Sequence, residues 1–188
     1  MMKFILVVCA TLFLTACEPE FPPKPRGYFR IDFPRKIYKV VEVPCPYGFS
    51  IPEYSVLIPY TQQPDKGCWY NIQFPRYKAT IHLTYSAVNN NLVRMTEESH
   101  ELAYKHTARA DAIEEFPVLF PDKKVYGTIY QLQGGTASNV QFYLTDSTRH
   151  FLRGALYFNA APNRDSLAPV LSFLTADIDR MIASFNWK

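Results

Sequence analysis

The sequence predicts an α+β domain in which an antiparallel sheet is flanked by two main helices. Short runs with alternating apolar and polar side chains are joined by links too short for parallel neighbours, as at residues 134–136 and 146–148. Two longer segments instead repeat apolar side chains at helical spacing, one before and one after the last three of those runs. Strands packed against segregated helices define the α+β class.

The expected strands follow the alternation along the chain. They are residues 28–33, 38–43, 69–74, 78–87, 124–132, 139–145 and 151–159. Within residues 78–87, Ile81 and Leu83 share one face, and His82 and Thr84 share the other. One face of this strand is therefore expected to join the core.

Proline and glycine separate the first strands. Residues 44–48 and 64–67 are predicted turns. We expect residues 49–60 to be irregular, because Pro52 and Pro59 cannot donate hydrogen bonds within a sheet.

Two helices are predicted. The first runs from about Leu92 to Ala110 or a little beyond, with Ile113 still on its apolar face, and a Phe-Pro pair then ends the pattern. The second has Ser166 as its cap and Pro169 in its first turn, where proline is tolerated. Its apolar stripe comprises Leu167, Val170, Leu171, Leu174, Ile178, Met181, Ile182 and Phe185.

The first seventeen residues predict a lipoprotein signal. Lys3 precedes an apolar run at residues 4–13, which is too short to span a membrane. The following Leu-Thr-Ala-Cys resembles the lipobox of bacterial lipoproteins, in which the chain is cut after Ala16 and Cys17 receives the lipid. We therefore expect Cys17 to attach the protein to a membrane. A non-lipidated signal peptide is the alternative.

The remaining sequence predicts a tether and one domain. Residues 1–16 are the removed signal, and residues 17–27 form a lipidated, proline-rich tether. Residues 28–188 suffice for a single α+β domain with a sizeable core. The formal net charge of the whole sequence is only +3, so we expect no nucleic-acid partner.

Two cysteines remain in the expected domain. Cys45 and Cys68 would lie in an oxidising compartment, and a disulfide between them would close a loop of roughly 20 residues. We predict this bridge; two buried free thiols are the alternative.

No arrangement of residues in the sequence predicts catalysis. His100 and His106 would point about 240° apart on a helix and cannot share a metal. We expect His106 to be a buried structural histidine, with a switch or ligand role as the alternative. Glu97, Glu98 and Glu101 with His100 are expected to form a solvated helix face, with metal or acid–base work as the alternative. We expect no cofactor, no metal and no small-molecule substrate.

Residues near the tether are candidates for protein contact. Tyr28, Phe29 and Arg30 combine aromatic and arginine side chains, which carry much of the energy of protein interfaces. The alternative is an edge strand packed on its own core.

Several motifs together resemble the GldD family of gliding-motility lipoproteins. They are Cys17, residues 25–34, 45–47, 104–107, 110–113, 155–158, 165–170 and 184–187. The resemblance implies a cell-envelope lipoprotein of gliding Bacteroidota, with its domain facing the periplasm, that associates with the gliding and type IX secretion machinery. It implies no catalytic residues. By analogy, the element order is similar to the PsbP/Mog1-like α/β/α sandwich.

Two functional hypotheses remain. The first is a non-catalytic envelope protein, required for gliding motility, that supports assembly or stability of the motility and secretion machinery. The second is an enzyme or small-ligand binder acting on envelope material, using His106 or the helix face at residues 97–101. A buried His106 with one backbone partner favours the first, and a deep pocket joining His106 to a carboxylate favours the second.

Overall fold

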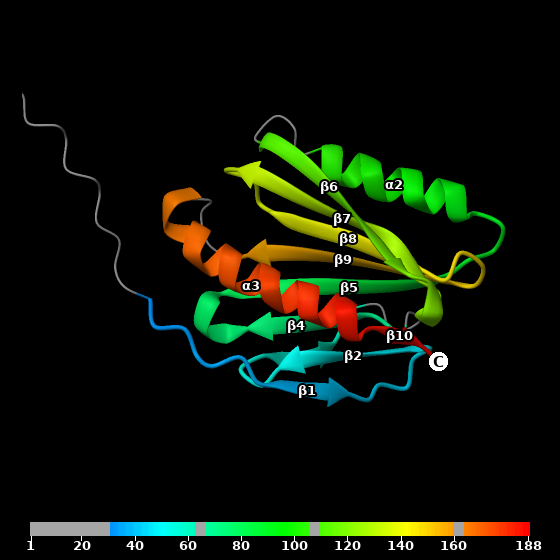
Figure 1. Ribbon diagram of the computed structural model, residues 1–188, viewed down its shortest axis with the longest axis horizontal. Helices are drawn as coiled ribbons and strands as arrows, with labels where there is room; N and C mark the ends of the chain where they lie inside the picture. Colours follow the sequence, from blue (N-terminus) through cyan, green and yellow to red (C-terminus); the bar gives the residue numbers. More distant parts are fainter. Residues whose placement is uncertain (1–30, 63–66, 106–109, 160–163) are drawn as a thin grey trace, which may run out of the picture. The chain divides into compact units, whose positions relative to one another are not determined.

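A seven-stranded antiparallel sheet forms the centre of the fold (Figure 1). The computed structural model describes residues 31–62, 67–105, 110–159 and 164–188, except the side chains of residues 164–166. Across the sheet the strands are β3 (Val56–Pro59), β4 (Tyr70–Phe74), β5 (Ala79–Ala87), β9 (His150–Phe158), β8 (Val140–Thr145), β7 (Val125–Gly134) and β6 (Ala110–Phe120). Residues Ile31–Lys188 belong to one compact unit.

Helices lie on both faces of this sheet. Helix α3 (Arg164–Ser184) and a small sheet cover one face, and helix α2 (Leu92–Tyr104) lies on the other (Figure 1). The small sheet consists of β1 (Tyr38–Val41), β2 (Tyr47–Pro52) and β10 (Asn186–Trp187), with β2 in the middle. Short 3-10 helices, η2 (Pro75–Tyr77) and η3 (Pro121–Lys123), precede β5 and β7.

Alternation along the strands divides the interior into two unequal cores. Phe142 and Leu144 of β8 point to the α3 side, where they join the main apolar cluster with Leu174 and Ile178. The α2 side holds a small cluster of Ala103, Tyr130 and Leu132. Most other α2-side positions of the central strands carry polar side chains, so this face of the sheet offers hydrogen-bonding and charged groups.

The α+β prediction is confirmed, as are the strands predicted from residue 69 to 87 and from 124 to 159 to within two residues at each end. In β5, Ile81 and Leu83 are buried whereas His82 is exposed. The period of two therefore correctly predicted which face of β5 joins the core.

The predicted first helix is too long. Helix α2 ends at Tyr104, and Ala110–Phe120 is strand β6, so the expectation that Ala110 and Ile113 continue the helix is wrong. Ile113 instead pairs with Leu132 of β7. A short apolar repeat is compatible with a helix or a strand, and hydrogen bonding to β7 makes this segment a strand. Pro117 is tolerated because β6 is an edge strand.

Two predictions near the start of the domain are also wrong. Residues 49–60 contain most of β2 and all of β3, because Pro52 and Pro59 are the last residues of those strands. Residues 31–33 lie in no strand, because Phe33 is followed by proline and instead stacks on Phe173 of α3, with ring centroids 4.3 Å apart.

The start of the last helix differs from the prediction. Helix α3 begins at Arg164, so Ser166 is not its cap and Pro169 lies inside the helix. Pro169 lacks the N–H that would donate to the carbonyl four residues earlier. The apolar stripe is as predicted, since Val170, Leu174 and Ile178 are buried.

Candidate functional site

Five of the predicted site residues lie outside the described residues. They are Cys17, Tyr28, Phe29, Arg30 and His106.

A disulfide links the small sheet to the large one. Cys45, two residues before β2, is joined to Cys68, two residues before β4, with their Cα atoms 5.6 Å apart. The Tyr47 hydroxyl donates a 2.8 Å hydrogen bond to the Cys68 carbonyl beside it. This corner fixes where β2 lies relative to β4.

A buried carboxylate ties the start of the domain to α3. Asp177 is 2% exposed, and it accepts hydrogen bonds from Lys36 Nζ (2.6 Å), the Tyr38 hydroxyl (2.8 Å) and the Tyr54 hydroxyl (2.5 Å). Lys36 also lies 4.0 Å from the centroid of the Phe173 ring. We call these five residues the Asp177 cluster.

The electrostatics of the Asp177 cluster favour a structural role. Burial, followed by the hydrogen bond to Asp177, raises the pKa of Tyr38 to about 12, and the same causes raise the pKa of Tyr54. Both phenols therefore remain protonated donors at neutral pH. Sequence analysis missed the cluster because Tyr38 and Tyr54 lie 139 and 123 residues from Asp177.

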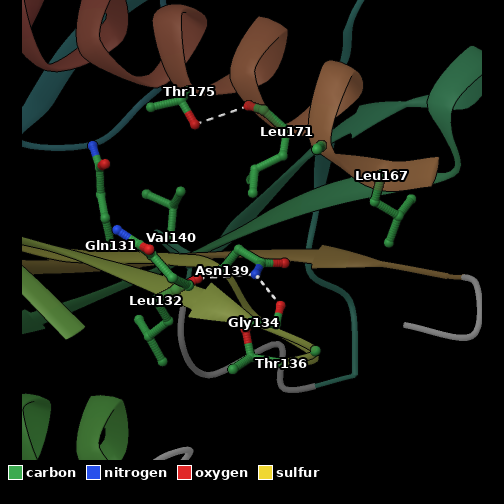
Figure 2. A pocket seen from close by; sticks show the side chains of 12 residues that line it. Gln131, Leu132, Gly134, Thr136, Asn139, Val140, Leu167, Leu171 and Thr175 are labelled. Carbon is green, nitrogen blue, oxygen red and sulfur yellow. Dashed lines mark hydrogen bonds between the residues drawn. The ribbon is translucent and has the colours of Figure 1, made fainter. Parts of the chain in front are cut away.

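A mostly apolar pocket of about 190 Å³ lies between the β7–β8 hairpin and α3 (Figure 2). Val140, Leu167 and Leu171 line it, and no charged side chain is among its described lining residues. Asn139 Nδ2 donates to the Leu132 carbonyl at 3.0 Å, and the Thr175 hydroxyl donates to the Leu171 carbonyl at 2.8 Å. Because the Asn139 amide and the Thr175 hydroxyl donate within the protein and no described lining side chain is charged, the pocket could accommodate an apolar group but supplies no acid or base.

The α2 side of the sheet carries the polar chemistry, with one cleft on each side of the helix. The first cleft, of about 420 Å³, contains His100 of α2 and Glu115 of β6. His100 Nε2 lies 3.6 Å from Glu115 Oε1, to which the Tyr104 hydroxyl donates at 2.8 Å. His100 and Glu115 are about half exposed, in agreement with the prediction of a solvated helix face.

The second cleft, of about 180 Å³, contains Arg153 of β9. Its guanidinium donates a 2.5 Å hydrogen bond to Gln141 Oε1 of β8. Gln141 is 1% exposed, and its Nε2 has no partner among the described residues. Burial lowers the pKa of Arg153, whereas Tyr157 and Glu98 favour its charged form. Sequence analysis did not single out Arg153, because nothing local marks a charged residue on the half-covered face of a strand.

The arrangement offers no complete catalytic set within the described parts of the chain. The His82 ring pairs with Asn71 and the His150 ring with Tyr85, and no Ser or Thr hydroxyl or Cys thiol there is hydrogen-bonded to a histidine ring. The described His, Cys, Asp and Glu residues form no group that could hold a metal ion. No described helix is long and apolar enough to cross a membrane. What the polar face does supply is hydrogen-bonding and charged groups suited to binding.

Comparison with known proteins supports both the fold and the family. A family model described as gliding motility lipoprotein GldD matches residues 18–187. The solution structure of cyanobacterial PsbP (CyanoP) from Synechocystis matches with a TM-score of 0.51 and 13% identity, covering 89% of this chain and 100% of that chain. This likeness confirms the predicted PsbP-like architecture. Comparison with curated protein sequences gave no significant match.

Proposed function

Because the chain belongs to the GldD family of gliding motility lipoproteins, we propose that it is a non-catalytic envelope protein that supports assembly or stability of the gliding and type IX secretion machinery. The observation that carries this proposal is the family match over residues 18–187, which includes every described residue except Lys188. The structure adds a domain whose described buried carboxylate, Asp177, serves packing.

The direct test measures the machinery itself. In cells lacking this chain, gliding should stop, and quantitative mass spectrometry of the envelope should show lower amounts of other gliding and secretion proteins. Restoring the wild-type chain should restore both. Normal amounts of every machinery protein in non-gliding cells would contradict the stability role.

Membrane attachment through Cys17 is the second part of the proposal. Residues 17–27 would then hold the domain, facing the periplasm, about 30 Å or less from the membrane surface. Cys17→Ser should abolish incorporation of a labelled fatty acid and release the protein into the soluble fraction. A variant that still incorporates the label would refute acylation at this residue.

The non-catalytic part concerns the cleft beside His100. Its histidine and carboxylate are exposed, and the Thr128 hydroxyl in the same cleft donates to the Tyr143 hydroxyl at 3.2 Å. Cells carrying His100→Ala with Glu115→Gln should therefore glide normally. Loss of gliding by a folded, abundant double variant, together with loss of a hydrolytic activity on isolated envelope, would favour an enzyme instead.

Tyr28, Phe29 and Arg30 are the proposed partner contact, close to the expected tether. Tyr28→Ala and Arg30→Ala should each reduce gliding and crosslinking to other machinery proteins at unchanged abundance. Lys39→Ala, an exposed position on β1, is the matched control and should have no effect. Normal gliding and normal crosslinks in both test variants would move the contact elsewhere.

A further inference from the structure

A groove follows β5 on the α2 side of the sheet. It comprises two cavities of about 180 Å³ each, which share Thr84 as a lining residue. We call it the β5 groove, and its lining includes Tyr60, Trp69, Asn71, His82, Thr84, Ser99 and Arg153. One end is aromatic, the other holds the guanidinium of Arg153, and nothing in the proposed function uses either end.

Strand register sets the distance between the two ends. Thr84 of β5 pairs with Arg153 of β9, and the pairing of Tyr70 with Leu83 places Trp69 beside Thr84 on its other side. Neighbouring strands lie about 4.8 Å apart, so the backbones at Trp69 and Arg153 are about 10 Å apart. One or two sugar residues with their substituents bridge such a span.

The aromatic end has the features of a sugar platform. The rings of Tyr60 and Trp69 lie 5.8 Å apart, and Trp69 Nε1 donates a 2.8 Å hydrogen bond to the Tyr85 carbonyl, which fixes the indole. Beside them, His82 Nδ1 and Asn71 Oδ1 are 2.7 Å apart. Aromatic faces bind the C–H faces of sugars, and an oriented amide and imidazole suit sugar hydroxyls.

The other end favours a negative charge. No described carboxylate lies within ion-pair distance of the Arg153 guanidinium, which donates instead to the neutral side chain of Gln141. Glu98 also lines this cavity and opposes an anion, but it is exposed, so water screens it. A guanidinium at a half-buried site binds carboxylates in a bidentate manner.

The hydroxyl groups between the two ends add acceptors. Thr84 and Ser99 already donate to the carbonyls of Arg153 and Met95, so their oxygen atoms can accept from a ligand hydroxyl. A ligand that offers several hydroxyl donors and one carboxylate would thus match the groove along its whole length.

We propose that the β5 groove binds a saccharide that carries a carboxylate, with the sugar ring against Trp69 and the carboxylate on Arg153. The site binds without turnover. This inference stands apart from the scaffold role and from the tether-proximal contact, and either can fail alone.

Two tryptophans make the test specific. The chain contains only Trp69 and Trp187, and Trp187 Nε1 donates to the Lys124 carbonyl at 3.1 Å, outside the groove. The ¹⁵N-labelled full chain in detergent micelles is titrated with N-acetylglucosaminyl-N-acetylmuramic acid, with a galacturonic acid trisaccharide and with neutral chitobiose. Either acidic probe should shift the Trp69 indole signal saturably and leave the Trp187 signal in place. The probe that binds more tightly identifies the source of the carboxylate.

The magnitudes follow from the carboxylate–guanidinium contact. A charge-assisted hydrogen bond is worth about 10- to 100-fold in affinity, so chitobiose should bind at least about tenfold more weakly than the better acidic probe. Arg153→Gln should remove this preference, and Arg153→Lys should keep part of it. Trp69→Phe, followed through the backbone amide signal of Thr84 because the Trp69 indole is then absent, should weaken binding of both acidic and neutral probes. Arg180→Gln, an exposed arginine on α3, is the matched control and should change nothing.

The outcomes decide the proposal in either direction. Trp69→Phe carries the test if both Arg153 variants fail to fold, as judged by the Trp187 signal and thermal unfolding. Equal binding of acidic and neutral probes, a shift of Trp187 rather than Trp69, or no shift with any probe would overturn it.

Discussion

Replacing Asp177 by alanine removes the carboxylate on which Lys36, Tyr38 and Tyr54 converge. The Tyr38 and Tyr54 hydroxyls would lose their acceptor. Because Asp177 is almost fully buried, water has little access to the vacated position and would not readily replace the carboxylate. Lys36 would lose less, since its side chain is 30% exposed and can turn toward water. The segment before β1 and the turn after β2 would then be held to α3 by apolar contacts and by the 2.8 Å hydrogen bond from Lys36 Nζ to the Phe173 carbonyl.

The cost can be estimated from these contacts. Each of the two partly buried hydroxyls left without a partner costs up to about 1–3 kcal/mol, and the partly exposed Lys36 adds about 1 kcal/mol or less. We expect Asp177→Ala to lower the free energy of unfolding by about 3–5 kcal/mol, the usual range for breaking a buried charge cluster. Asp177→Asn keeps one acceptor oxygen and should cost about half as much.

Urea unfolding of the purified chain measures this effect. With an m-value of roughly 2 kcal/mol/M, the Asp177→Ala midpoint should fall by about 2 M. The sharper test is Tyr54→Phe, made in both backgrounds. It should cost about 1–2 kcal/mol in the parent and close to nothing after Asp177→Ala, because the hydroxyl then has no acceptor. An equal cost in both backgrounds would refute the claim that this hydrogen bond stabilises the fold.

Three further predictions concern other parts of the domain. Mass mapping of the non-reduced protein should find Cys45 joined to Cys68, and Cys45→Ser with Cys68→Ser should cost about 2–4 kcal/mol in thermal unfolding; two freely alkylated thiols would refute the bridge. Burial alone would raise the pKa of Asp146, but backbone N–H groups of the β8–β9 turn lower it to about 2; its contribution is therefore complete above pH 3.8 and lost as pH falls toward 2. Asp146→Ala should thus destabilise at pH 7 and show weaker acid sensitivity, whereas parallel pH profiles would contradict this. A Cβ at Gly154 would overlap the Phe142 ring, so Gly154→Ala should cost about 1–3 kcal/mol or more, and Phe142→Leu should recover part of the loss in a chemical denaturation series.

Much of the fold could be predicted from local pattern. The side chains of β5 and β8 alternate between apolar and polar types along each strand, because one face of each strand lies in the main apolar cluster. The apolar stripe of α3 could also be predicted from the sequence, because one face of this helix is buried along the main cluster. In these elements the local order of apolar and polar side chains is enough to predict the type of secondary structure and its buried face.

Strand β6 shows where local pattern fails. Its side chains are mostly exposed, so neither period is enforced, and the pairing of Ile113 with Leu132 makes it a strand. Proline was misleading for the same reason: Pro59 and Pro117 lie in edge strands, and whether a strand is at an edge depends on the order of the whole sheet.

The sequence by itself determined the α+β class, strands β4, β5, β7, β8 and β9, the apolar stripe of α3 and the family. Only the tertiary structure decided which polar groups meet. Asp177 meets Tyr38 and Tyr54 across more than 120 residues, and Trp69 and Arg153 come to one groove through the register of three strands. The physical reason is that side-chain periodicity is a local property, whereas the partners of a buried or half-buried polar group are set by packing between segments far apart in the chain.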